Sequence, residues 1–491
     1  MRVSFKLQDV FLELICLLYV LLFVYAAVSK LLDFENFQVQ LGQSPLISSF
    51  AGFTSFFIPI FELLLAFFLI FPKSRRISLY LSTFLMSAFS AYIFVMLNFS
   101  PNVPCSCGGI LEQLGWKEHL YFNLLFVFLG TIALYLENRV LIKQTSMALL
   151  FLFSLSFLTI YMLFHTSEWI QQERNNFTRS FPHYPTKYVN ELDLKFNSYY
   201  IAGYGPDKVY LGNYTAPLIV TEIDSSLHSK KEHYIILPAT SFQYKSLTLT
   251  VDPPYFYVWD GTEGFVYKGS TADWKAKLYI NREAYFTSFV PISSNRASFR
   301  AISSSTHQNV LGTFEVDDSV KVFLNPKVLK KQVDGLFDTD GTHLYNKQHH
   351  KIVYTYYYRN QYAVCDTLLQ FHQYGTTIDT THEAKIKVKY IASKQGSKLS
   401  DPAVTVNKRT ATYGNYLYVH AGLLGRYEPK ENWEHNSIID VYDFTHSTYQ
   451  FSFYIDDKLK SKLKDFRVSE DLIYTLTGTH IRTYRFKEKF Y

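Results

Sequence analysis

Apolar residues dominate the first third of the chain, and short apolar runs alternate with polar residues over the rest. Five stretches in the first third have few or no charges, and each is long enough to cross a bilayer, which takes about 20 residues of helix. Because these stretches are apolar on nearly all sides, they lack the one-sided stripe of a soluble helix. They lie near residues 10–32, 48–71, 77–97, 119–137 and 147–165. We therefore expect an α-helical membrane bundle of about five transmembrane helices over residues 1–165.

The second half of the chain has the pattern of many short strands. Runs rich in Tyr, Val, Ile, Phe and Thr are separated by Gly, Asp, Asn and Lys turns, which is typical of an all-β domain. An apolar strand, a Gly-bearing turn and a second strand recur at 199–214, 255–269, 335–347, 416–429 and 472–486. Such repeats favour a six-bladed β-propeller over residues 196–491. A two-sheet sandwich is the alternative, and it is disfavoured because one sandwich rarely uses so many strands.

Residues 166–195 separate these two regions. The segment is polar, carries Pro182 and Pro185, and has little apolar pattern. We expect it to be a linker. The last strand pair, near 472–490, is then expected to close the propeller against strands near 196–214.

Charge adds an orientation to this picture. The net charge of +6 is scattered along the chain, so nucleic-acid binding is not expected. Lys and Arg favour cytoplasmic loops, and they occur before the first stretch, after the second and after the fourth. The opposite side has only Lys117 and Lys30, and Lys30 could snorkel to the interface. We expect a bacterial inner-membrane protein with a cytoplasmic amino terminus and a periplasmic C-terminal domain. The cytoplasmic charges are Arg2, Lys6, Lys73, Arg75, Arg76, Arg139 and Lys143.

Two cysteines lie one residue apart in the expected periplasmic loop. Cys105 and Cys107 are in NVPCSCGG (102–109), shortly before Trp116 and His119. A disulfide within C-x-C closes a very small, strained ring that accepts electrons readily, so one interpretation is redox-active thiols. The second is a structural disulfide or an inert turn. The third is metal capture by Cys105, Cys107 and His119, although the spacing matches no strong zinc pattern.

Ionisable residues within membrane spans are costly and are candidates for function. Glu62 is in the middle of the second apolar stretch, in PIFELLLAF (59–67). It is either a protonated carboxyl group hydrogen-bonded to a neighbouring helix or a proton relay. The other two cysteines, Cys16 and Cys365, are expected to be buried, unreactive residues.

The first 140 residues resemble the DoxX-like and MauE-like redox-associated membrane proteins, which are small four-helix inner-membrane bundles. The resemblance rests on VSKLLDFENFQVQLGQSPLI (28–47), FELLLAF (61–67) and PCSCGGILEQLGWKEHLYFN (104–123). It implies an association with periplasmic thiol oxidation and with the maturation of disulfide-bearing partners. A more distant similarity to the vitamin K epoxide reductase bundle would imply a quinone as cofactor. This chain has C-x-C rather than C-x-x-C and no second extracytoplasmic pair, which argues against direct quinone reduction.

Taken together, these features predict a thiol–disulfide redox-associated protein whose site comprises Cys105, Cys107, His119 and Glu62. The propeller would dock a periplasmic client or a thioredoxin-like protein, and loops in 421–437 are the candidate surface, with Arg426, Trp433 and His435. The alternative is a non-enzymatic membrane-anchored propeller that acts as an assembly or sensor subunit. The second half of the sequence has no evident Ser-His-Asp, paired-carboxylate or metal-binding pattern, and a propeller is more often a binding platform than an enzyme.

Overall fold

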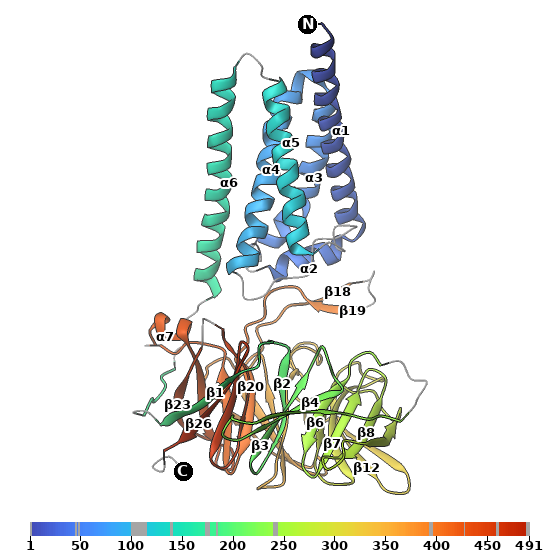
Figure 1. Ribbon diagram of the computed structural model, residues 1–491, viewed down its shortest axis with the longest axis vertical. Helices are drawn as coiled ribbons and strands as arrows, with labels where there is room; N and C mark the ends of the chain where they lie inside the picture. Colours follow the sequence, from blue (N-terminus) through green and yellow to red (C-terminus); the bar gives the residue numbers. More distant parts are fainter. Residues whose placement is uncertain are drawn as a thin grey trace. The chain divides into compact units, whose positions relative to one another are not determined.

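The computed structural model consists of two compact units. It describes residues 2–44, 47, 50–99, 115–137, 141–171, 177–182, 185–238, 244–391, 396–426, 428–457 and 461–487. One unit comprises Met1–Glu173 together with Ile386–Ala403, and the other comprises Arg174–Lys385 and Val404–Tyr491. The first is helical and the second is all-β (Figure 1).

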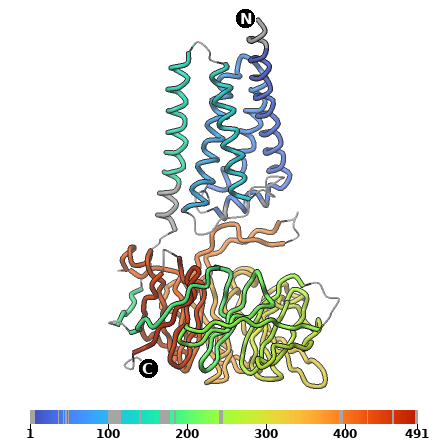
Figure 2. Tube along the Cα trace, in the orientation of Figure 1, coloured from blue at the N-terminus to red at the C-terminus, as the bar shows by residue number. Residues whose placement is uncertain are grey.

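Five long apolar helices form the first unit, as the sequence predicts. Each is long and apolar enough to cross a membrane, and Figure 2 shows them running alternately up and down along the bundle axis. A short helix that the sequence did not indicate, α2, follows the first of them. The helices are α1 (Arg2–Leu32), α2 (Phe34–Gln43), α3 (Ala51–Ile70), α4 (Pro72–Phe99), α5 (Trp116–Glu137) and α6 (Ile142–Gln171).

The bundle packs around aromatic residues of α1 and α5. Tyr19 and Phe23 are fully buried, and the Tyr19 hydroxyl donates a 2.6 Å hydrogen bond to the Phe126 carbonyl. A side chain at Gly130 would overlap the Tyr19 hydroxyl, so glycine allows α5 to approach α1 closely. The opposite faces of the helices expose large apolar side chains, which suits contact with lipid. On α1 they include Leu7, Val10, Leu14, Leu17, Leu21 and Val28.

A β-hairpin from the second half of the sequence belongs to the helical unit. Its strands are β18 (Val388–Ile391) and β19 (Gly396–Leu399), and both contact α2. The Lys389 ammonium donates a hydrogen bond to the Gln38 side chain of α2. The helical unit is therefore built from two segments that are far apart in the sequence.

The second unit is a six-bladed propeller of four-stranded antiparallel sheets, and the sandwich alternative is wrong. The first blade consists of β2 (Tyr199–Gly205), β3 (Lys208–Asn213), β4 (Ile219–Asp224) and β5 (Lys230–Tyr234). The second consists of β6 (Thr248–Asp252), β7 (Tyr255–Asp260), β8 (Phe265–Ser270) and β9 (Ala276–Asn281). The third consists of β10 (Ser288–Pro291), β11 (Arg296–Ile302), β12 (Asn309–Val316) and β13 (Val320–Asn325). The fourth blade consists of β14 (Gly341–Asn346), β15 (Lys351–Tyr356), β16 (Gln361–Asp366) and β17 (Phe371–Thr376). The fifth consists of β20 (Asn407–Tyr413), β21 (Tyr416–Ala421), β22 (Asn436–Asp443) and β23 (Thr448–Asp456), and the short helix α7 (Lys430–His435) precedes β22.

The sixth blade closes the ring and uses both ends of the unit. Its strands are β24 (Leu463–Val468), β25 (Leu472–Thr477), β26 (His480–Phe486) and, on the outside, β1 (Thr186–Asp193), in the order β1-β26-β25-β24. Strand β24 contacts β2 of the first blade, so the two ends of the ring adjoin as expected. The hydrogen-bonded closure, however, is made by β1, which lies in the segment expected to be a linker. Because β1 is an outer strand without a fully buried side chain, its sequence has no apolar alternation to reveal it.

A second contact fastens the start of the propeller. The Arg179 guanidinium binds the Asp440 carboxylate, with Nε to Oδ1 at 2.6 Å, and the Glu428 carboxylate, with Nη1 to Oε1 at 2.7 Å. All three side chains are less than a tenth exposed. The two carboxylates more than balance the charge of the guanidinium, and together with the Leu423 carbonyl they accept its hydrogen bonds, as a buried guanidinium requires. Residues 177–182 are thereby held against the blade of β20–β23.

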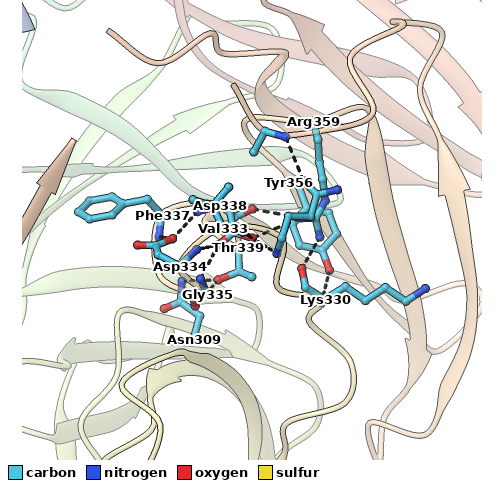
Figure 3. Close-up of polar contacts among 12 residues, drawn as sticks. Asn309, Lys330, Val333, Asp334, Gly335, Phe337, Asp338, Thr339, Tyr356 and Arg359 are labelled. Atoms are coloured by element: carbon cyan, nitrogen blue, oxygen red, sulfur yellow. Dashed lines mark hydrogen bonds and ion pairs between the residues drawn. The ribbon is translucent and has the colours of Figure 1, made fainter. Parts of the chain in front are cut away.

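Another buried cation organises the loop between β13 and β14 (Figure 3). Arg359 and Asp338 are completely buried, with Nη1 and Oδ2 3.7 Å apart, and the guanidinium lies 3.6 Å from the centre of the Tyr356 ring. Burial alone would raise the pKa of Asp338, but hydrogen bonds from backbone amides, that of Gln332 first, hold the pKa below its usual value. The Asp338 carboxylate therefore stays charged and pins the loop to the turn after β15.

Candidate functional site

A buried ion pair lies among the membrane-spanning helices. Lys30, in the last turn of α1, pairs with Glu62, near the middle of α3, and their side chains are only 11% and 1% exposed. The Lys30 ammonium also lies 5.7 Å from the centre of the Phe89 ring and 5.9 Å from that of Phe37. Lys30 thus turns into the bundle instead of snorkelling to the interface, and Glu62 has its partner on a neighbouring helix. A charge pair in this apolar setting is costly to keep unless both charges are matched.

Several buried polar atoms of α2, α3 and α5 lack hydrogen-bond partners among the described residues. They are the second carboxylate oxygen of Glu62, both amide atoms of Gln40 and the amide nitrogen of Asn123. Gln40 is one turn from Phe37, and Asn123 is one turn from His119, whose imidazole is close enough to Lys30 to interact with its charge. Unpaired buried polar groups are rare in proteins. We call Lys30, Glu62 and His119 the intramembrane polar site.

The two cysteines of the C-x-C pair lie outside the described residues. Their loop joins α4, which ends at Phe99, to α5, which begins at Trp116 and bears His119 in its first turn. Lys30 is at the α2 end of α1, so the loop is anchored at the same end of the bundle as Lys30 and His119 (Figure 1). The structure therefore brings Glu62 and Lys30 together and places His119 nearby. Whether the thiols act with them stays a prediction.

The remaining cysteines are buried and unpaired. Cys16 is in α1, and Cys365 is in β16, where its thiol donates to the Ile352 carbonyl over 3.8 Å. Burial raises the pKa of Cys365 to about 12, so this thiol stays protonated and unreactive at neutral pH. Among the described residues, no group of three or more His, Cys, Asp and Glu side chains could hold a metal ion. The proposed metal set of Cys105, Cys107 and His119 includes two residues beyond that part of the chain.

The propeller encloses a central cavity of about 430 Å³. The innermost strand of each blade lines it, namely β2, β6, β10, β14, β20 and β24. Most charged residues that line it are basic. Two of them have carboxylate partners: Lys347 pairs with Asp252, which also lines the cavity, and Arg300 pairs with Asp340, which does not. Sequence reasoning missed this cavity because its residues come from six separate strands.

His343 is a titratable group buried in the wall of this cavity. Its Nδ1 is 3.2 Å from the Ser288 hydroxyl oxygen, and its Nε2 is 3.0 Å from that of Ser298. Burial, and then the positive charge of Arg300, lower the pKa of His343 to about 3. The imidazole is therefore neutral at physiological pH, with one nitrogen donating to a serine and the other accepting.

Replacing His343 by glutamine should make the propeller less sensitive to acid. The pKa of His343 is about 3 in the folded protein, against an ordinary 6.5. Below pH 6.5 the imidazole is therefore protonated in the unfolded chain, whereas in the folded protein it stays neutral until the pH approaches 3. Stability from this residue is complete above pH 6.5 and is lost as the pH falls, by about 3 kcal/mol at pH 4. Urea unfolding at pH 7 and pH 4 measures the loss, which should be smaller in His343→Gln. Equal losses in the two proteins would show that His343 is not the group responsible.

The loop surface proposed for partner docking is made partly of packing contacts. The backbone amide of Arg426 donates to the Phe177 carbonyl at 2.8 Å, and the Trp433 carbonyl accepts a hydrogen bond from the Lys462 ammonium. The indole of Trp433 is half-buried, and His435 is exposed. The structure leaves the docking role as a prediction.

Comparison with known proteins identifies a relative for the helical unit. Residues 8–136 match the sequence family described as methylamine utilisation protein MauE. That match spans α1 to α5 almost entirely and includes the C-x-C loop and the intramembrane polar site. The resemblance predicted from the sequence is thus confirmed, and the chain is a membrane protein with a MauE-like region. No curated protein matches the chain.

Three solved structures resemble the chain at about 10% identity or below. A virginiamycin B lyase from Staphylococcus aureus, crystallised with quinupristin, is 10% identical with a TM-score of 0.37, covering 62% of this chain and 100% of the other. An exported protein from Bacteroides fragilis is 9% identical with a TM-score of 0.38, covering 64% and 99%. The structure of a nidogen/laminin complex is 10% identical with a TM-score of 0.32, covering 51% and 76%. Similarities this low carry no argument about function.

Proposed function

We propose that the protein takes part in thiol–disulfide exchange on the periplasmic side of a bacterial inner membrane, through Cys105 and Cys107. The observation that carries this proposal is the buried Lys30–Glu62 pair, with His119 nearby, inside a MauE-like bundle whose α4–α5 loop bears both cysteines. A cation and an imidazole at that end of the bundle are the groups that stabilise a thiolate and accept its proton. The distribution of Lys and Arg supports this orientation.

The exchange would proceed through one mixed disulfide. A thiolate of a partner dithiol attacks the Cys105–Cys107 disulfide, so one cysteine bonds to the partner and the other leaves as a thiolate. The partner's second thiolate then attacks the partner sulfur of the mixed disulfide. The partner ends oxidised, and Cys105 and Cys107 end as thiols that carry the two protons the partner lost. His119 is the candidate proton carrier, while the Lys30 cation favours the departing thiolate and Glu62 keeps that cation in place.

The propeller would hold the partner during this exchange. Its loops around Arg426, Trp433 and His435 are the proposed docking surface, and a thioredoxin-like protein or a periplasmic client is the proposed partner. A quinone that removes the electrons would need a second cysteine pair or direct contact with the first. The chain has no second pair in its periplasmic loops, so we propose that a second protein dithiol–disulfide pair reoxidises the site.

Single cysteine-to-serine variants test the exchange. Because the reaction is reversible, a lone cysteine can attack a partner's disulfide, and the bond persists when the resolving cysteine is absent. We expect Cys107, beside Gly108 and Gly109, to bond to the partner, so Cys105→Ser should accumulate a mixed disulfide. The measurement is a non-reducing gel of cells quenched with acid.

Cys365→Ser is the matched control, because that buried thiol should neither trap a partner nor change the pattern. A membrane-impermeant maleimide should label Cys105 or Cys107 in reduced, outer-permeabilised cells, which tests the orientation. If both single variants trap nothing and keep full function, the redox proposal is wrong. The protein is then better described as a membrane-anchored propeller with an assembly or sensor role.

A further inference from the structure

A second cavity of about 310 Å³ opens at one end of the propeller channel. It lies between three blades, at the start of β20, the end of β21, the start of β24 and the turn that follows β15. Its lining includes the cations Lys408, Arg409 and Lys464, and none of the described lining residues is a carboxylate. We call it the basic cavity. It shares Tyr357 and Arg409 with the central cavity, so the two spaces adjoin.

A β-bulge supplies two of these cations. In β20, Asn407 pairs with Ala421 and Arg409 pairs with His420, so Lys408 is an extra residue without a partner on β21. Consecutive side chains of a regular strand point to opposite faces, and a bulge re-aims them. Lys408 and Arg409 can therefore line the same cavity, as they do here.

These cations are not neutralised by the described part of the protein. Neither Lys408 nor Arg409 forms an ion pair with a described carboxylate. Asp457, whose charge acts favourably on the Lys408 ammonium, is itself paired with Lys462 at 2.8 Å, and the centre of the Trp433 ring lies 5.2 Å from the Lys408 ammonium. Among the described residues, the Lys464 ammonium donates to the carbonyls of Asn197 and Tyr199 and lies 5.6 Å from the centre of the Tyr214 ring. Burial, and then the nearby Lys462, lower the pKa of Lys408. The cavity thus carries excess positive charge, part of it on the partly buried Lys408, and such charge is unfavourable without a counter-charge.

His420 adds an unused hydrogen-bonding atom. Its side chain is only 2% exposed, and its Nδ1 has no hydrogen-bond partner among the described residues. Burial, and then Lys408, lower the pKa of His420 well below its usual value, so the imidazole is neutral. A neutral imidazole can carry its proton on Nδ1 and donate it to an anion. An orphaned buried donor beside unpaired cations is the arrangement expected of an anion-binding site.

We propose that the basic cavity binds the oxyanion group, phosphate or carboxylate, of a small ligand. Lys408, Arg409 and Lys464 would neutralise the group, and His420 would donate to it. The rest of the ligand would lie along Tyr357 and Tyr358 and extend into the central cavity. This site is independent of the thiol chemistry, because it is built wholly from propeller residues.

Isothermal titration of the purified full chain in zwitterionic-lipid nanodiscs tests this site, with pyrophosphate and citrate as probes. At least one probe should bind with one-to-one stoichiometry, and binding should weaken as salt is raised. Lys408→Met and Arg409→Gln should each weaken binding at least tenfold. The matched control is Lys321→Met, which removes an equal charge from an exposed position on β13 and should bind as the natural protein does.

Arg409 is exposed toward the cavity, so its replacement keeps the test valid even if Lys408→Met fails to fold. Nanodiscs that contain an anionic phospholipid identify the source of the oxyanion. Competition with the probe there indicates a lipid headgroup, and unchanged binding indicates a free small anion, and either result supports the site. Absence of binding for both probes, or equal weakening in Lys321→Met, would overturn the proposal.

Discussion

Replacing Lys30 by methionine should destabilise the helical unit by about 3–5 kcal/mol, the usual cost of leaving one partner of a buried ion pair unmatched. Glu62 is only 1% exposed and already has one carboxylate oxygen without a hydrogen bond among the described residues. Without the ammonium, its charge would have no counterpart among the apolar helices. Unfolding of the detergent-purified chain in increasing SDS, followed by circular dichroism at helical wavelengths, measures the loss.

The double variant Lys30→Met with Glu62→Gln separates stability from function. It removes both charges at similar volume, so most of the lost stability should return, because no unmatched charge remains. If the pair serves thiol exchange, the double variant should still fold yet form the mixed disulfide more slowly. A single Lys30→Met variant that is as stable as the natural protein would contradict the buried pair. A double variant that folds and exchanges at the natural rate would restrict the pair to a structural role.

The second large effect is expected at the start of the propeller. A fragment beginning at residue 197 lacks β1 and Arg179, whereas a fragment beginning at 174 keeps both. The shorter fragment loses the strand that pairs with β26 from Thr186–Phe486 to Asp193–His480. It also leaves Glu428 and Asp440 buried without their cation. We expect the fragment from 174 to melt cooperatively and the fragment from 197 to aggregate or to melt without a sharp transition.

A third fragment, beginning at residue 185, is the matched intermediate. It retains β1 and lacks Arg179, so it should close the ring but be less stable than the longest fragment by about 3–5 kcal/mol. Thermal melts by circular dichroism and size-exclusion chromatography compare the three proteins. If the fragments from 197 and 174 melt at the same temperature, closure by β1 and the Arg179 contacts contributes nothing to stability.

Features that depend on neighbouring residues in the chain were predictable. Five uninterrupted apolar stretches suffice to predict five spanning helices, because length and hydrophobicity alone decide whether a helix is stable in lipid. The many short strands were predictable for the same reason, and the recurring strand–turn–strand units favoured a propeller. The resemblance to MauE-like proteins followed from three short motifs, and residues 8–136 match that family.

Features that depend on distant residues were not predictable. The sequence singled out Glu62 and suggested that Lys30 faces the interface, but only helix packing places the two side chains together across 32 positions. The contacts of Arg179 with Glu428 and Asp440 span about half of the chain. The cations of the basic cavity are scattered along the sequence, because the propeller brings them together from separate blades.

The sequence by itself determined the two kinds of domain, the membrane-spanning segments and the cysteine loop as the candidate for chemistry. Each of these follows from the hydrophobicity, periodicity or reactivity of residues close together in the chain. Tertiary structure alone decided that β1 closes the ring, that a hairpin from the second half joins the helical unit, and that Lys30 turns inward to Glu62. An outer strand or a buried charge is stabilised by groups hundreds or dozens of positions away, so its local sequence carries no trace of its partner.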